Sequence, residues 1–127
     1  MTESERDRRV GREALVIEHM QSENVQDWNR TMATFSRARY ELPDGRVIDG
    51  HDDVMRYWIE GRTDVPDQRN ELIRLEHIDD AHVLIEFWLR GTPITTGEPF
   101  ELRLWAIYDF DANDLMTNER VYVARPV

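Results

Sequence analysis

The sequence predicts one α+β domain in which helices precede an antiparallel sheet. Segments with apolar residues at helical spacing lie within residues 10–61, whereas four long strand-like segments fill residues 69–124. Turn-forming residues, such as those at 79–80 and 111–114, separate these strands. Helices first and strands later is the pattern of a sheet with helices on one face. The 127 residues suit a single domain, predicted to span residues 1–127, with a core and one modest cavity.

The predicted helices span residues 10–23, 28–36 and 52–61. Asn24 is suited to cap the first helix at its C-terminus, and Asp27 to cap the second at its N-terminus. Residues 1–8 are expected to form a flexible, solvated arm or the frayed start of the first helix. The third helix, which carries Trp58, has the clearest helical pattern in the chain.

The predicted strands span residues 39–42, 46–48, 69–78, 81–91, 99–110 and 115–124. The first two form a hairpin around the turn Pro43-Asp44-Gly45. Residues 83–89 are too apolar for a strand with one face in water, so we expect both of its faces to be covered.

The composition excludes several kinds of chemistry. Without cysteine there is no disulfide, thiolate nucleophile or Cys-ligated metal, and without lysine there is no Schiff base. The net charge of −10 disfavours binding to nucleic acid. No apolar run approaches the roughly 20 residues that cross a bilayer, and the polar N-terminus lacks a signal-peptide core. We therefore expect a cytoplasmic protein that binds neither nucleic acid nor membrane.

No metal or cofactor is expected. His51, His77 and His82 lack the spacing of metal ligands, and Asp52 is better explained as a residue that starts a helix.

Several stretches resemble landmarks of the nuclear transport factor 2-like superfamily. They are Asp27-Trp28, Gly50–Val54, Phe87–Thr92, Trp105–Asp111 and Glu119–Tyr122. In their order and spacing the chain is similar to the SnoaL-like subgroup, which is related to ketosteroid isomerases and polyketide cyclases. The resemblance implies a cone-shaped α+β barrel, in which a curved antiparallel or mixed sheet wraps around three N-terminal helices. Its open end would hold a small organic molecule.

The chain departs from that subgroup at the catalytic positions. Catalytic members keep a tyrosine on the first helix and acids on the hairpin and the penultimate strand. The matching positions here hold His19, Leu42 and Ala106. Any catalysis by this chain therefore needs other groups.

Three residues are the catalytic candidates. His19 is predicted to be the acid–base residue, because imidazole suits proton transfer near neutral pH and Glu23 lies one helical turn later. Arg120 is predicted to bind a substrate carboxylate or enolate, or to pair with an internal acid such as Glu41. Tyr40 is expected to donate a hydrogen bond to a substrate oxygen.

Each candidate has a structural alternative. His19 would be a half-exposed surface histidine, Arg120 would face solvent if the strand register differed by one residue, and Tyr40 would be a core tyrosine.

The predicted pocket lining is mostly apolar with a few polar groups, as in many small-molecule sites. Strand alternation and helical spacing select its members. They are Trp28, Met32, Met55, Trp58, Ile85, Phe87, Ala106, Tyr108, Asn118 and Tyr122. The opposite face of the sheet carries Trp88 and Trp105 beside aliphatic and charged residues, which predicts a homodimer packed through this face.

Two functions are consistent with these residues. The first is a cofactor-independent enzyme, namely a cyclase, isomerase, dehydratase or hydrolase acting on a carbonyl-bearing or polyketide-like molecule. The alternative is a non-catalytic domain of the same fold for small-molecule binding or dimeric assembly. An apolar cavity open to solvent favours ligand binding, whereas a cavity filled by side chains favours assembly.

Overall fold

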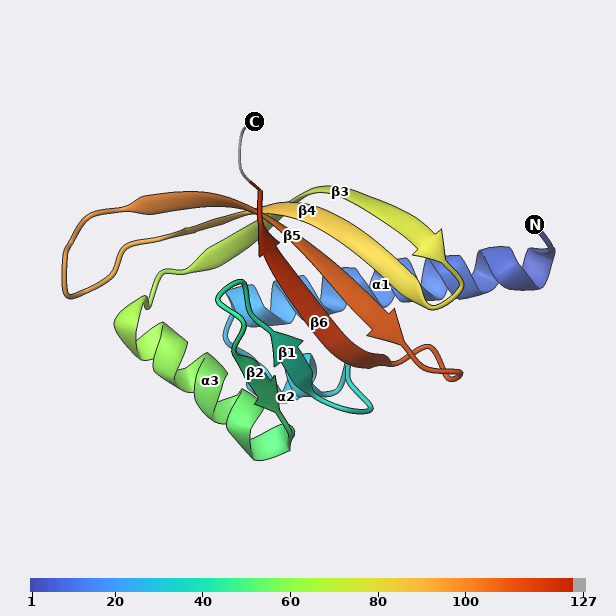
Figure 1. The fold of residues 1–127 in the computed structure, drawn as a ribbon, viewed down its shortest axis with the longest axis horizontal. Coiled ribbons are helices and arrows are strands. Elements are labelled where there is room, and N and C mark those ends of the chain that lie inside the picture. Colours follow the sequence, from blue (N-terminus) through green and yellow to red (C-terminus); the bar gives the residue numbers. More distant parts are fainter. Residues whose placement is uncertain (125–127) are drawn as a thin grey trace.

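A computed structural model describes residues 1–124, which form three helices and six strands in the predicted order (Figure 1). Residues 125–127, part of the predicted domain, lie outside the described residues. The helices are α1 (Glu3–Asn24), α2 (Trp28–Met32) and α3 (His51–Asp64). The strands are β1 (Arg39–Glu41), β2 (Val47–Asp49), β3 (Arg69–Asp79), β4 (His82–Gly91), β5 (Phe100–Phe110) and β6 (Met116–Val123). Within residues 1–124, no helix has the length and apolar character required to cross a membrane.

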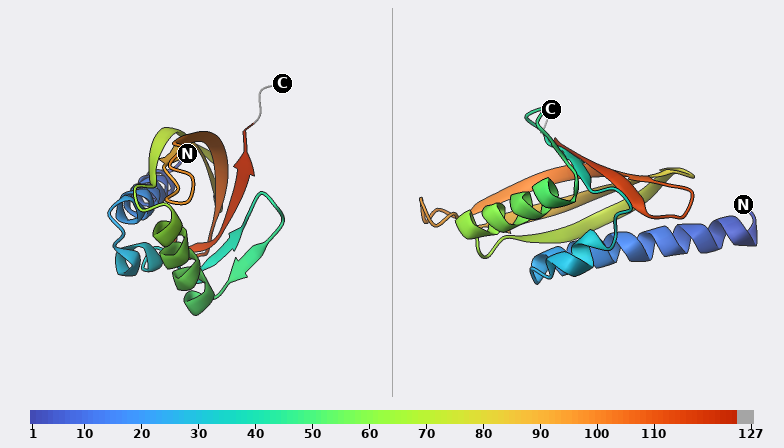
Figure 2. Two further views of the ribbon diagram at one scale, coloured as in Figure 1. Left: turned by 90° about the vertical axis from the view of Figure 1, so that its left-hand side faces the viewer. Right: turned by 90° about the horizontal axis from the view of Figure 1, so that it is seen from below.

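The strands form one mixed sheet in the order β2-β1-β6-β5-β4-β3. β1 pairs in parallel with β6, and the other neighbours are antiparallel. Seen end-on, the sheet is an open arc with the helices on its inner side (Figure 2). This arrangement confirms the expected α+β cone, with a sheet that does not close.

The inner face of the sheet forms the core together with α1 and α3. Val83, Ile85 and Ala106 are fully or almost fully buried there, as are Val16 of α1 and Val54 of α3. Ile85 lies opposite Ala106 in the pairing of β4 with β5, so both side chains point to the same face. Alternation along β4 and β5 therefore follows the prediction.

Of the two alternatives for residues 1–8, the structure has the start of a helix, because α1 already begins at Glu3. Thr2 accepts a hydrogen bond from the Glu5 backbone (3.1 Å), and the Glu5 carboxylate accepts one from the Thr2 backbone (3.0 Å). This capping box satisfies the free N–H groups of the first turn. Arg8 then binds Asp114 at 3.0 Å, which attaches the first turns to the turn between β5 and β6.

The second helix is shorter than predicted and ends at Met32. The residues that follow pair with the start of β6: Thr34 accepts a hydrogen bond from the Met116 backbone (3.0 Å), and the Ser36 backbone donates one to Met116 (2.9 Å). These backbone bonds take the place of another helical turn. Asp27 caps the helix as predicted, accepting a hydrogen bond from the Arg30 backbone.

Candidate active site in the cone

A cavity of about 170 Å³ lies between the inner face of the sheet, α1, α3 and the hairpin. Six of the predicted residues line it, namely Trp28, Tyr40, Trp58, Ile85, Phe87 and Tyr108. Trp28 and Trp58 stack with ring centroids 5.6 Å apart and form one aromatic wall. Leu42 lines the cavity as well, so the hairpin contributes an apolar side chain to it.

Of the five predicted lining residues that do not border the cavity, three lie in or against the core. Ala106 is fully buried, and Met32 and Met55 pack against the core. Helical spacing placed these methionines on the core side of their helices, but neither of them lines the cavity.

His19 is fully buried behind the cavity wall, in contact with two carboxyl groups. Its Nε2 lies 3.2 Å from Glu23 Oε1 and 3.0 Å from Glu119 Oε1. On the other side of the ring, Nδ1 lies 2.8 Å from the Thr34 hydroxyl, which donates its own proton to the Thr31 carbonyl. The Thr34 hydroxyl can therefore only accept from His19, which fixes a proton on Nδ1.

The Tyr40 hydroxyl connects this cluster to the cavity. It lies 3.1 Å from His19 Nε2, accepts a hydrogen bond from Trp58 Nε1 (3.1 Å) and donates one to Glu23 (3.1 Å). Glu23 also accepts a hydrogen bond from the Asn70 amide at 3.1 Å. Tyr40, Glu23, Glu119 and Asn70 all line the cavity, so a bound molecule can contact the polar cluster directly.

The environment raises the pKa values of His19 and Glu119 and lowers that of Glu23. Burial alone would lower the pKa of His19, but the charge of Glu23 and the hydrogen bonds with both carboxyl groups outweigh it and raise the pKa to about 10. Burial likewise opposes ionisation of Glu23, yet the adjacent His19 charge leaves its pKa below the ordinary value. For Glu119, burial and the charge of Glu23 prevail over His19, and the pKa is raised. At neutral pH the cluster therefore holds an imidazolium and an ionised Glu23, while Glu119 retains its proton more readily than an ordinary glutamate does.

Within residues 1–124, the side chains of His19, Glu23 and Glu119 form the one group that could hold a metal ion. His19 Nε2 and one oxygen each from Glu23 and Glu119 lie within 4.8 Å of one another. A cation there would have to displace the imidazolium proton, which the raised pKa of His19 opposes.

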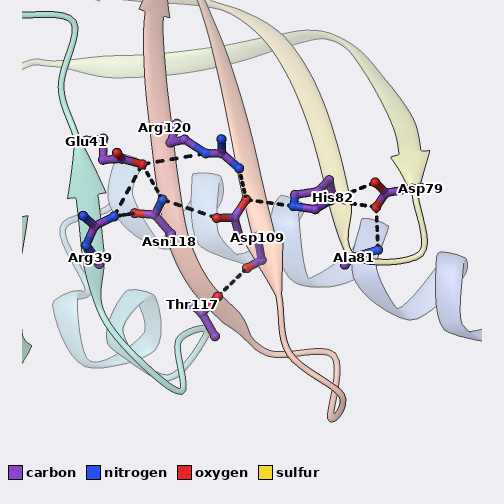
Figure 3. A network of polar contacts seen from close by, with 9 residues as sticks. All are labelled: Arg39, Glu41, Asp79, Ala81, His82, Asp109, Thr117, Asn118 and Arg120. Carbon is purple, nitrogen blue, oxygen red and sulfur yellow. Dashed lines mark hydrogen bonds and ion pairs between the residues drawn. The ribbon is translucent and has the colours of Figure 1, made fainter. Parts of the chain in front are cut away.

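Arg120 points to the outer face of the sheet, so the prediction that it lies in the pocket is wrong. Its guanidinium binds Asp109 at 2.6 Å and lies 3.7 Å from Glu41, within a row of polar side chains that crosses the outer face from β1 to β4 (Figure 3). The expected pairing of Arg120 with Glu41 thus exists, but outside the cone.

Asn118 and Tyr122 share that outer face with Arg120, and the predicted inward position is wrong for them too. Asn118 donates to Glu41 at 2.7 Å, and Tyr122 is 46% exposed. The register breaks near Asp109 and Phe110, where the strand pairing skips Thr117, and this bulge shifts the alternation of β6 by one residue.

The bulge places Glu119 and Val121 on the inner face, and both line the cavity. Glu119 is therefore a candidate site residue that sequence reasoning missed. In the sequence it stands among Asn118 and Arg120, which are equally polar, so composition gives no signal for it. The apolar Val121 two residues later is the hint that was available.

Fold and site together define an α+β cone with a mostly apolar cavity and a buried carboxyl–imidazole cluster in its wall. The family model for the SnoaL-like domain matches residues 16–119, and the chain belongs to this family.

Solved structures support the same assignment of fold. The chain is similar to the epoxide hydrolase/cyclase-like enzyme SalBIII of pyran ring formation in the polyether salinomycin (TM-score 0.81, 16% identity, 91% of this chain and 92% of that one). It is also similar to a ketosteroid isomerase-like protein from Catenulispora acidiphila in complex with trimethylamine (TM-score 0.77, 13% identity, 87% and 85%). A third similar structure is a computationally designed 17-OHP binder (TM-score 0.75, 16% identity, 88% and 90%). A search among curated protein sequences finds no match.

Proposed function

We propose that the chain is a cofactor-independent enzyme that applies acid–base chemistry to a small carbonyl-bearing or polyketide-like molecule. The reaction class is that of a cyclase, isomerase, dehydratase or hydrolase. One observation carries this proposal: Glu23 and Glu119 both line the cavity, and their pKa values are moved in opposite directions. Two carboxyl groups separated in this way are the usual basis for assigning an acid and a base.

In this proposal Glu119 transfers the proton. Its raised pKa favours the protonated form, which can donate a proton to a substrate oxygen, and the carboxylate left behind can then accept one from a carbon beside the carbonyl. The His19 imidazolium, 3.0 Å away, stabilises the carboxylate that forms after donation. His19 has no direct access to the cavity, so we assign it to charge stabilisation instead of direct proton exchange with substrate.

Tyr40 supplies the hydrogen bond to the substrate oxygen. Trp58 holds its hydroxyl in place, and its proton can turn from Glu23 to an oxyanion that develops in the cavity. The same fold carries an epoxide hydrolase/cyclase-like enzyme and a computationally designed 17-OHP binder, which supports a small organic molecule as the occupant.

The test is the isosteric substitution Glu119→Gln. We expect the rate to fall at least about 100-fold, the ordinary contribution of general acid–base catalysis, with little change in fold. Deuterium exchange at the carbon beside the carbonyl, measured by NMR on a panel of small cyclic ketones, reports proton transfer directly. Glu76→Gln, on the exposed part of β3, is the matched control and should exchange at the wild-type rate.

A loss of less than threefold in Glu119→Gln would remove Glu119 from the mechanism. Absence of exchange by the wild-type protein across the panel would favour the non-catalytic binding function.

The proposed enzyme acts as a homodimer through the outer face of the sheet. Trp105 and Tyr122 lie opposite each other on β5 and β6 and are 42% and 46% exposed. Trp88 is partly covered by its own chain, since Arg90 and Arg103 lie 5.3 and 5.8 Å from its ring. Trp105 and Tyr122 are therefore the apolar centre that a second copy would cover.

A further inference from the structure

Arg62 of α3 is an arginine buried at the cavity wall without an acidic partner. It is 7% exposed and lines the cavity, and its guanidinium lies 5.5 Å from the centre of the Trp28 ring. One of its nitrogens donates to the Gln68 carbonyl. Within residues 1–124, none of the ion pairs within 4.0 Å includes Arg62. Most of its five N–H donors are thus free for a ligand.

The negative charge of Glu23 acts on Arg62 without direct contact, but the Glu23 oxygens already contact other side chains. They contact His19, Tyr40 and Asn70 at 3.1–3.2 Å. Burial lowers the pKa of Arg62, and Glu23 compensates only in part. A buried guanidinium without a close counter-charge is costly, and an anion in the cavity would remove that cost.

Asn70 gives a second, independent indication of a ligand. It is 8% exposed and lines the cavity, and its Oδ1 is buried without a hydrogen-bond partner among the described residues. Its Nδ2 faces the Glu23 carboxylate, which fixes the orientation of the amide and leaves Oδ1 as an unused acceptor. A ligand hydroxyl would satisfy this acceptor.

The cavity also limits the size of the ligand. Its volume of about 170 Å³ is close to the roughly 150 Å³ of an apolar cavity that holds benzene. Trp58 and Phe87 offer flat apolar walls for a ring. One ring with small substituents fits this space.

We propose that Arg62 binds a carboxylate, and that the substrate is a small, single-ring hydroxycarboxylic acid. Its carboxylate pairs with Arg62, and its hydroxyl donates to Asn70 Oδ1. The carboxylate site does not depend on catalysis. Calling the bound acid a substrate rests on the proposed function of the same cavity.

Calorimetric titration with 4-hydroxybenzoate and 4-hydroxybenzamide tests the proposal, because the two probes match in size and differ in charge. We expect the acid to bind the wild-type protein at least about tenfold more tightly than the amide, the usual effect of one charge-assisted contact. Arg62→Gln should abolish this preference, and Arg62→Lys should keep part of it. Arg56→Gln on the exposed side of α3 is the control and should behave as wild type.

Equal binding of acid and amide by the wild-type protein overturns the inference without any variant, and so does an unchanged preference in Arg62→Gln. Glu119→Gln should still prefer the acid, because it removes proton transfer but not Arg62. In the wild-type protein, a carboxylate preference without any exchange activity overturns the proposed reaction alone, whereas exchange activity without that preference overturns the carboxylate site alone.

Discussion

At the scale of single residues, His19 is held by contacts on both ring nitrogens and by two carboxyl groups. Its burial would exclude the charged form if Glu23 and Glu119 were absent. The ion pairs reverse this effect, so the imidazolium becomes part of the folded structure. This coupling makes the stability of the whole domain depend on the charge of one side chain.

We predict that stability falls as pH rises from 7 to 9.5. The pKa of His19 is about 10 in the folded state and about 6.5 in an unfolded chain, so the folded state binds the extra proton between these values. The stabilisation is complete below pH 6.5 and is lost towards pH 10. Urea unfolding should show a decrease of at least about 2 kcal/mol in the free energy of unfolding over this interval.

His19→Gln should flatten this pH dependence, because no proton is then bound at this position. His51→Gln is the matched control, since the His51 side chain is 65% exposed and should leave the slope unchanged. An equal slope in wild type and His19→Gln would contradict the assignment.

The candidate site could be predicted from the sequence only in part. The aromatic lining follows from helical spacing and strand alternation, which are local properties, whereas His19 was selected by residue type and by its match to the family's tyrosine position. Arg62 could not be recognised, because an arginine in the last turn of a helix is usually solvated and favourable there. Its lack of a partner is a tertiary property that appears only when α3 packs against Trp28 and Gln68.

At the scale of elements, the N-terminal half of α1 is attached by Arg12. This side chain is 1% exposed and donates to the Asp80 carbonyl in the turn between β3 and β4. Residues 1–8 are charged, and their sequence alone favours a solvated arm. The contacts of Arg8 and Arg12 with two distant turns explain why they are helical instead.

We predict that Arg12→Ala destabilises the domain by about 2–4 kcal/mol. The substitution removes a buried side chain and leaves the Asp80 carbonyl without its donor. Arg6→Ala, on the exposed side of the same helix, should change stability by less than about 0.5 kcal/mol. Chemical denaturation of both variants makes the comparison, and equal effects would show that Arg12 does not attach the helix.

The order and bounds of the four long strands were predictable because apolar runs and Asp-rich turns are local signals. The face of the sheet to which each β6 side chain points was not predictable, because one bulged residue moves every side chain beyond it to the opposite face. This single inversion exchanged Arg120 for Glu119 at the candidate site.

At the scale of the whole molecule, the parallel pairing of β1 with β6 brings the two halves of the chain together. Tyr40 lies opposite Glu119 in this pairing, so the hairpin and the last strand each supply a polar group to the cluster. The inner face is then covered by helices, whereas the outer face has no covering element in the part of the chain that the structure describes (Figure 2). Trp105 and Tyr122 remain exposed on that outer face.

We predict that the protein is a dimer at micromolar concentration and that Trp105→Arg makes it a monomer. The arginine can keep a contact with Glu86, to which Trp105 Nε1 donates at 2.8 Å, so the fold should persist. Burial of the added charge at the centre of an apolar interface costs desolvation energy, which opposes association. Light scattering gives the mass, and Ile59→Arg on the exposed face of α3 is the control that should stay dimeric. A wild-type monomer under these conditions would show that the outer face serves another purpose.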